Sequence, residues 1–146
     1  MSYENPWLYK GEVFDTEQIK DNYGFVYLIE CIETPRKYLG RKYFFSFRTP
    51  KGGKRKVKQF SDWKKYYGSC PELKEEIKRL GKDKFKRTIL SLHKTLGKTN
   101  YEETRQLFLN NVLTESLEDG TPVYFNSNIL SRYFRKDYFT YKNIEV

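Results

Sequence analysis

The chain has 146 residues, of which 38% are hydrophobic and 18% aromatic, and its formal net charge is +9. A chain of this length is expected to form one domain over residues 1–146 and to bury about two-thirds of its surface. The aromatic content argues against disorder, no apolar run approaches the ~20 residues of a membrane span, and the N-terminus lacks the pattern of a secretory signal, so we expect a cytoplasmic protein.

The first predicted elements form a β-hairpin. Residues 1–23 contain scattered aromatic side chains and are expected to be an ordered lead-in that packs on the domain. Apolar strands follow at 24–32 and 37–45, separated by a turn at 33–36. Because successive side chains point to opposite faces of a strand, this spacing predicts that Tyr27 and Tyr38 lie on one face of the hairpin.

The rest of the chain predicts helices and short strands. A helix is expected at 69–81, with Pro71 in its first turn and Gly81 at its end. The remaining predicted elements are a loop at Gly52-Gly53, strands at 57–63, 85–92 and 123–125, and helices at 98–112 and 129–138. This order gives an α+β fold, with a small, mainly antiparallel sheet flanked by helices.

The positive charge is concentrated in one segment. Residues 36–65 contain twelve Lys and Arg and one acid, Asp62, a net charge of +11, so the rest of the chain is slightly acidic. A basic stripe mixed with aromatic residues is typical of nucleic-acid binding, although a run such as Lys51–Lys58 can also be a solvated loop. Two cysteines and one histidine make no zinc pattern, and His93 is interpreted as structural.

Two motifs on the predicted hairpin, Phe25-Val26-Tyr27 and Tyr38-Leu39-Gly40, resemble the signature of the GIY-YIG nuclease superfamily. Phe25 replaces the first glycine of the signature, and the basic segment comes before the first helix. The resemblance covers residues 24–128, and the Tyr-Tyr-Gly-Ser stretch that contains Tyr67 is similar to phage-encoded, homing-type members. It implies a three-stranded antiparallel sheet flanked by helices and a DNA endonuclease that requires Mg²⁺ or Mn²⁺ and leaves a 5′-phosphate and a 3′-hydroxyl.

The resemblance also implies roles for individual residues. Tyr27 would accept a proton from the attacking water or orient it, which requires a pKa lowered by nearby cations or metal, and Tyr38 would bind phosphate or water. Arg48, ten residues after Tyr38, is ranked first as the phosphate-binding arginine and Arg41 second. Tyr67 would be an additional partner of water or phosphate.

The metal ligand implied by the resemblance is a glutamate on the second helix, Glu103, with Glu102 as the competitor. Mg²⁺ takes oxygen ligands and often only one or two protein carboxylates. Thr99 followed by Glu102 and Asn100 followed by Glu103 both form capping-box patterns, and an N-cap at Thr99 would leave Glu103 free for metal. Asn126 would support the site, or it forms a turn.

DNA is the expected partner, and no small-molecule cofactor is expected. The expected DNA-binding residues are Lys42, Lys54, Arg55, Lys56, Lys58, Lys64 and Lys65. The chain is too short for a second, DNA-recognition domain, so target specificity is either low or supplied by a homodimer or a partner. Two alternatives are a non-catalytic nucleic-acid-binding protein of the same fold and a basic module that inhibits or binds another protein.

Overall fold

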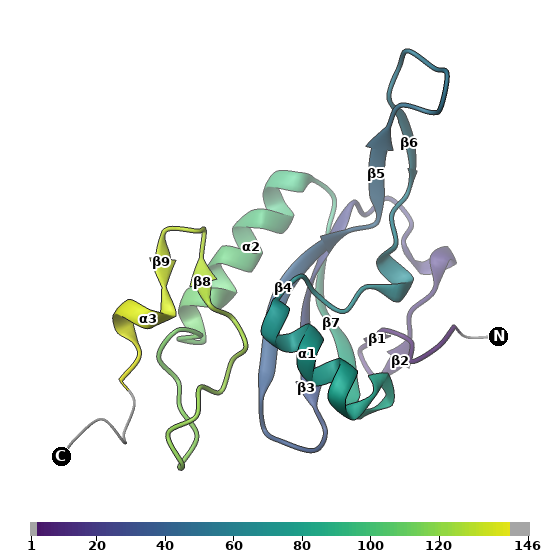
Figure 1. Cartoon of the computed structure of the whole chain (residues 1–146). Helices are drawn as coiled ribbons and strands as arrows, with labels where there is room; N and C mark the ends of the chain where they lie inside the picture. Colours follow the sequence, from purple (N-terminus) through teal and green to yellow (C-terminus); the bar gives the residue numbers. More distant parts are fainter. Residues whose placement is uncertain (1–2, 141–146) are drawn as a thin grey trace.

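The computed structural model describes residues 3–140 (Figure 1). Its elements are β1 (Leu8–Tyr9), β2 (Glu12–Val13), η1 (Thr16–Gln18), β3 (Gly24–Cys31), β4 (Lys37–Tyr43), β5 (Phe45–Arg48), β6 (Val57–Phe60), η2 (Trp63–Lys65), α1 (Pro71–Leu80), η3 (Lys82–Lys84), β7 (Phe85–His93), α2 (Leu96–Leu109), β8 (Asn128–Ile129), β9 (Tyr133–Phe134) and α3 (Arg135–Tyr138). None of the helices in this part of the chain has the length and apolar character needed to cross a bilayer.

The main sheet has five strands in the order β2-β1-β7-β3-β4. Strands β7, β3 and β4 form an antiparallel core, which is the predicted three-stranded sheet. The prediction was incomplete, because the lead-in adds β1 parallel to β7 and β2 antiparallel to β1, which makes the sheet mixed. These added strands have two residues each, too few to give an alternating pattern in the sequence.

The predicted hairpin is confirmed as β3 and β4. Tyr27 lies opposite Gly40, and Tyr38 lies opposite Ile29. Directly opposite residues of an antiparallel pair share a face, so both phenols lie on the same face, and their ring centroids are 6.2 Å apart. Strand β3 is internal to the sheet whereas β4 is an edge strand, so the two tyrosines differ in depth.

The two faces of the sheet are covered by different helices. On one face, α1, η2 and the lead-in enclose a core rich in aromatic residues, which includes Trp7, Phe25, Trp63 and Leu73. The predicted packing of the lead-in aromatics is thereby confirmed. On the other face, Leu107 of α2 packs with Val26 and Leu39 of the sheet and with residues of the C-terminal segment, including Ile129. Figure 1 shows α1 and α2 on either side of the sheet.

A buried arginine fixes the lead-in to the sheet. Arg87 on β7 is 1% exposed, and its guanidinium donates hydrogen bonds to the backbone carbonyls of Asn5, Lys64 and Tyr66. The Trp7 and Tyr67 rings also contact it, with centroids 4.7 Å and 4.2 Å from its Cζ atom. One side chain thus holds the lead-in, η2 and the central sheet together.

Helix α2 begins earlier than the sequence predicted. Its N-cap is Thr95, whose hydroxyl oxygen accepts a hydrogen bond from the Lys98 backbone N–H. The predicted caps at Thr99 and Asn100 are wrong, because Thr99 is buried inside the helix and donates its hydroxyl to the Thr95 carbonyl. A Cβ at Gly24 would lie 2.7 Å from the Thr99 hydroxyl oxygen, so this glycine allows α2 to pack closely on β3.

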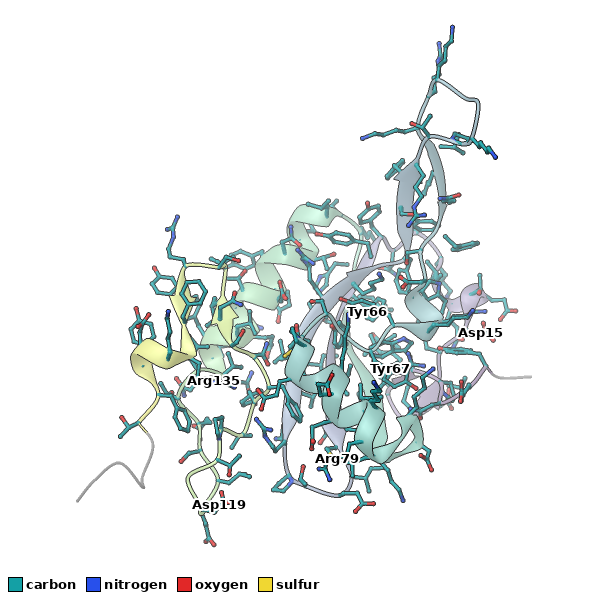
Figure 2. The ribbon with its side chains drawn as sticks, in the orientation of Figure 1. Asp15, Tyr66, Tyr67, Arg79, Asp119 and Arg135 are labelled. Carbon is teal, nitrogen blue, oxygen red and sulfur yellow. The ribbon has the colours of Figure 1, made fainter. Side chains whose placement is uncertain are left out.

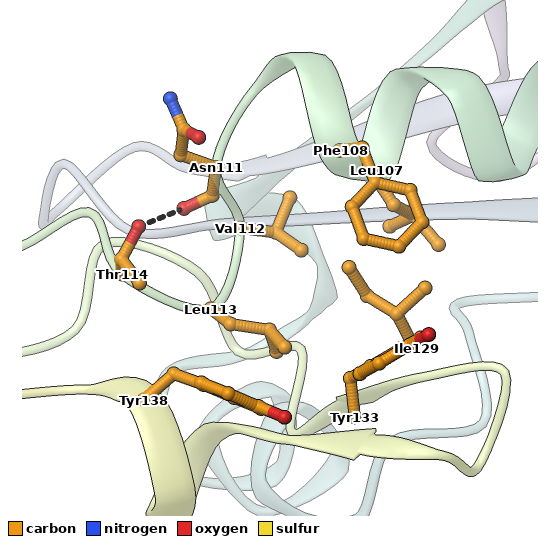
Figure 3. A pocket seen from close by; sticks show the side chains of 9 residues that line it. All are labelled: Leu107, Phe108, Asn111, Val112, Leu113, Thr114, Ile129, Tyr133 and Tyr138. Atoms are coloured by element: carbon orange, nitrogen blue, oxygen red, sulfur yellow. Dashed lines mark hydrogen bonds between the residues drawn. The ribbon is translucent and has the colours of Figure 1, made fainter.

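The C-terminal segment differs most from the prediction. Residues 129–138 form the β8–β9 hairpin and the short helix α3 instead of one helix, and residues 123–125 make a single bridge to β4, between Tyr124 and Lys37, instead of a strand. The hairpin packs on the end of α2, leaving a small apolar pocket (Figure 3). Its lining residues are Leu107, Phe108, Asn111, Val112, Leu113, Thr114, Ile129, Tyr133 and Tyr138.

Strands β5 and β6 form a separate two-stranded hairpin that extends away from the rest of the molecule (Figure 1). The predicted return strand is confirmed as β6, and Gly52, with φ +80°, lies in the connecting turn. All four residues of β6 are exposed. Much of the basic segment therefore lies outside the body of the protein.

Candidate active site

A polar pocket lies at the free edge of β4. It is lined by residues from β4, from the start of α1, from α2 and from the loop after residue 125: Tyr38, Arg41, Ser69, Cys70, Pro71, Glu103, Leu107, Asn126, Ser127, Asn128, Leu130 and Ser131. Tyr38 and Arg41 are three residues apart and project from opposite faces of the strand. The pocket therefore wraps around an edge strand and receives side chains from both sides of the sheet.

Glu103 and Arg41 meet in this pocket. Thr99, Glu103 and Leu107 are spaced by one helical turn, so they share the face of α2 that packs on the sheet. Arg41 Nε lies 3.6 Å from Glu103 Oε1 and has no hydrogen-bond partner within residues 3–140. Burial raises the pKa of the Glu103 carboxyl above its ordinary value, and the Arg41 charge partly offsets this rise.

The competing residue, Glu102, has a different environment. Its carboxylate accepts hydrogen bonds from Arg105 and Gln106, and it does not line the pocket. The hydrogen bond from Arg105 lowers the pKa of Glu102. The choice of Glu103 over Glu102 as the residue that faces the site agrees with the structure, although the capping argument behind it was wrong.

Tyr38 is the tyrosine that lines the pocket. Burial raises the pKa of Tyr38 to about 12, although a hydrogen bond from Ser69 acts in the opposite direction. A phenol with this pKa is protonated at neutral pH, so it can donate a hydrogen bond to a phosphate or a water. This behaviour fits the predicted role of Tyr38.

Tyr27 lies behind Tyr38 in the core. It is 1% exposed and is not among the pocket-lining residues. A Cβ at Gly40 would lie 2.6 Å from its hydroxyl oxygen, so the glycine of the second motif makes room for this phenol. Burial, and then the nearby Tyr66 and Tyr38 phenols, raise the pKa of Tyr27 well above its ordinary value. The expected lowering of this pKa by nearby cations is not found, because the groups that act on Tyr27 are phenols and the Glu103 carboxylate.

Asn126 fixes the loop that closes the pocket. Its amide is 5% exposed, its Nδ2 donates to the Leu39 carbonyl (2.8 Å), and its Oδ1 accepts from the Leu39 backbone N–H (3.1 Å). The side chain thus pairs with the free edge of β4 in the manner of a neighbouring strand. Arg36 and Arg135 hold the same loop through hydrogen bonds to the Pro122 and Tyr124 carbonyls.

Two predicted residues lie away from the pocket. Arg48, ranked first as the phosphate-binding arginine, is exposed at the end of β5 in the protruding hairpin and does not line the pocket with Tyr38. Tyr67 accepts a hydrogen bond from Asn5 and stacks with Arg87. The spacing of residues in the sequence could not show that the chain extends from the body of the protein after β4 to form the β5–β6 hairpin. This path places Arg48 away from the pocket, whereas Arg41 lies at it.

The predicted DNA-binding cations fall into two groups. Lys42 and Lys64 form ion pairs within the protein, with Nζ 2.6 Å from an Asp62 oxygen and 3.0 Å from an Asp15 oxygen. The other cations are exposed: Lys54, Arg55, Lys56, Lys58 and Lys65. Exposure and charge make this second group the one that can reach a phosphate backbone.

The sequence missed residues that the fold brings close to the motif tyrosines. Ser69 donates a hydrogen bond to Tyr38, and the Tyr66 ring lies edge-on to Tyr27, with centroids 6.0 Å apart. Both belong to the Tyr-Tyr-Gly-Ser stretch, of which only Tyr67 was singled out. Figure 2 labels Tyr66 and Tyr67, the adjacent residues that have these different neighbours. The presence of this stretch indicated that residues near the site lie here, but the sequence could not show which of the two tyrosines points toward the sheet.

The donor set of the pocket is compatible with one magnesium ion. Among residues 3–140, no three His, Cys, Asp or Glu side chains form a group that could hold a metal, so Glu103 is the carboxylate that the pocket offers. Mg²⁺ commonly binds through one or two carboxylates and completes its shell with water and phosphate oxygens. A half-buried carboxylate beside a guanidinium without a hydrogen-bond partner fits that arrangement.

Comparison with known proteins agrees with these motifs. The family model described as "Putative endonuclease segE, GIY-YIG domain" matches residues 7–129, which is most of the chain. No curated protein and no solved structure matches. The matched range includes both tyrosine motifs, α1, α2 and Asn126, and it ends within β8. The chain belongs to the segE family of GIY-YIG endonuclease domains.

Proposed function

We propose that the protein is a metal-dependent endonuclease that hydrolyses phosphodiester bonds of DNA. The observation that carries this proposal is the meeting of Tyr38, Arg41 and Glu103 in one polar pocket at the edge of β4. The family of nuclease domains to which the chain belongs supports the same reaction class. A hydrogen-bond donor, a fixed positive charge and a carboxylate are the groups that phosphodiester hydrolysis needs.

Each residue has a separate part in the proposed reaction. The scissile phosphate binds beside Arg41, whose guanidinium offsets the negative charge that builds up during attack by water. Tyr38, protonated at neutral pH, donates a hydrogen bond to a phosphate oxygen or orients the water. Glu103 would hold Mg²⁺ or Mn²⁺, which when bound would supply positive charge to the phosphate. Asn126 keeps β4 and the pocket loop in register.

The proposal is tested by plasmid nicking. The purified protein is expected to convert supercoiled plasmid to nicked and linear forms with Mg²⁺ or Mn²⁺, and not with EDTA. If the protein binds the plasmid but does not cleave it with either Mg²⁺ or Mn²⁺, the non-catalytic DNA-binding alternative is supported. Indifference to DNA together with co-purification of an acidic protein would support the protein-binding alternative.

The two motif tyrosines are expected to differ in their effect on cleavage. Tyr38→Phe removes a donor that faces the pocket and should lower the cleavage rate by about 10²-fold. Tyr27→Phe removes a buried hydroxyl that is hydrogen-bonded to Tyr66, so it should cost about 1 kcal/mol of stability and lower the rate less than Tyr38→Phe does. Single-turnover rates and thermal unfolding measure the two effects. A larger rate loss for Tyr27→Phe would show that the buried phenol is the reactive one.

The cations at the turn of the protruding hairpin are expected to bind phosphates. Replacement of Lys54, Arg55 and Lys56 by alanine should flatten the plot of log affinity against log salt concentration by about 0.9 for each phosphate that is no longer neutralised, about 2.7 for the three. The measurement is a DNA-binding titration at several salt concentrations without divalent metal. An unchanged slope would mean that these side chains are only solvated.

A further inference from the structure

The protruding β5–β6 hairpin has two chemically different faces. Ser46 lies opposite Gln59, and Arg48 lies opposite Val57, so these four side chains share one face. Phe45, Phe47, Lys58 and Phe60 share the other. We call the first the polar face and the second the aromatic face.

The aromatic face is partly occupied by contacts within the protein, through Phe45, while Phe47 and Phe60 remain exposed. Phe45 and Phe60 stack with centroids 5.2 Å apart, and Lys58 Nζ lies 4.1 Å from the Phe45 ring centroid. Tyr23 of the body packs on the same Phe45 ring. This face therefore anchors the hairpin and turns the polar face away from these contacts.

The polar face has no comparable contacts. Arg48, Val57 and Gln59 are exposed. Within residues 3–140, the side chains of Arg48 and Gln59 form no hydrogen bond or ion pair. The Arg48 charge contributes at longer range to the lowered pKa of Asp62, whose main cause is the hydrogen bond with Lys42. An exposed guanidinium and an exposed amide on the same face of the hairpin are free to bind an external ligand.

The chemistry of the polar face matches the edges of DNA bases. In the major groove, Arg binds guanine O6 and N7, Gln binds adenine N6 and N7, Ser pairs with either, and apolar groups contact the thymine methyl. A two-stranded ribbon fits a groove about 12 Å wide and about 8.5 Å deep. Four strand residues extend about 13 Å, which is longer than the groove is deep.

The charge distribution favours the same ligand. The turn between the strands carries Lys51, Lys54, Arg55 and Lys56, all exposed, and positive charge attracts the phosphates that border the groove. We propose that the β5–β6 hairpin enters the major groove of duplex DNA with Ser46, Arg48, Val57 and Gln59 on base edges and the turn on the phosphate backbone. Arg48 is then a residue that determines sequence specificity.

The connection between hairpin and pocket sets the geometry of this recognition. Arg48 on the polar face is seven positions after Arg41 in the pocket, a span of at most about 25 Å of extended chain. One turn of DNA is about 34 Å long. The cleaved bond therefore lies within one helical turn of the bases that the hairpin contacts.

This inference rests on the proposed function for the identity of the ligand, and its test does not require cleavage. The Glu103→Gln variant is used without divalent metal to select bound duplexes from a pool with a randomised centre. It should enrich a short sequence motif. Arg48→Ala and Gln59→Ala, each added to this background, should each erase one position of the motif. Each should weaken binding of the selected duplex by about 5-fold to 150-fold and leave the salt slope unchanged.

Matched controls separate this role from others. Phe47→Ser, on the exposed part of the aromatic face, should leave the motif intact, whereas the triple alanine variant of the turn should weaken all duplexes alike. The inference is overturned if the parent enriches no motif, if Arg48→Ala and Gln59→Ala enrich the same motif as the parent, or if double-stranded RNA of that sequence binds as tightly, since its narrow major groove excludes side chains.

Failure of the inference and failure of the proposed function give different results. A protein that nicks plasmid with metal but enriches no motif is a nuclease whose hairpin does not recognise sequence. A protein that enriches the motif but never nicks plasmid has the recognition surface without the activity. Loss of cleavage of every DNA by Arg48→Ala, at unchanged affinity for the selected duplex, would instead assign Arg48 to catalysis and overturn its role on base edges.

Discussion

Replacement of Glu103 by glutamine is expected to lower metal-dependent cleavage by at least about 10²-fold. Glu103 is the carboxylate of the polar pocket, and glutamine keeps its size while removing the charge that holds the metal ion. Because burial raises the pKa of this carboxyl, the carboxylate is lost as the pH falls through a value above its ordinary pKa. Metal affinity and cleavage should therefore decline at a higher pH than an exposed glutamate would allow.

Glu102→Gln is the matched control for this prediction. It makes the same chemical change one position earlier on α2, where the carboxylate binds Arg105 and Gln106 outside the pocket. Cleavage should remain close to wild type. Single-turnover cleavage with Mg²⁺, together with DNA binding in EDTA, distinguishes loss of metal from loss of substrate. If Glu102→Gln is the inactive variant, the assignment of the metal ligand is wrong.

The parts of the fold that the sequence predicted are those governed by local pattern. Apolar segments on either side of a turn defined β3 and β4, the spacing of the two tyrosines defined their shared face, and Pro71 and Gly81 marked the ends of α1. The depth of the two tyrosines depended instead on strand order. Tyr27 is on an internal strand and Tyr38 on an edge strand, and the residues that decide this order lie more than forty positions further along, in β7.

The C-terminal prediction failed because of backbone conformation. The spacing of apolar residues at 129–138 fits one face of a helix. In the structure, Leu130 and Ser131 have φ values of 58° and 50°, in the left-handed region, which stops a helix and forms the turn between β8 and β9. The Asn128 side chain accepts a hydrogen bond from the Ser131 backbone N–H and stabilises this turn.

The orientation of Glu103 shows how a correct expectation can rest on a wrong cause. Capping at Thr99 was expected to free Glu103, but the N-cap is Thr95. What turns Glu103 toward the pocket is the close packing of Thr99 on Gly24, one helical turn earlier on the same face. The glycine that opens β3 therefore influences the position of a carboxylate almost eighty residues later.

Replacement of Arg41 by alanine is expected to lower the cleavage rate by about 10²-fold to 10³-fold, the loss typical of one group positioned on the reacting charge. Arg41 lies at the pocket beside Glu103, and its side chain is 41% exposed, so its guanidinium can bind a phosphate oxygen. Lysine keeps the charge but not the two-pronged geometry, so Arg41→Lys should recover only part of the activity.

The control for Arg41 is Arg79→Ala, which removes the same charge from the exposed side of α1, where Arg79 pairs with Glu76. Its cleavage rate should match that of the wild type, because it lies away from the pocket. The rates of both variants are compared at saturating DNA, where a change reports the chemical step and not affinity. Arg41→Ala could instead raise only the DNA concentration needed for half-maximal rate. Arg41 would then stabilise the bound substrate and the transition state to the same extent. The positive charge that stabilises the negative phosphate in the transition state would then have to come from another residue of the pocket or from the metal alone.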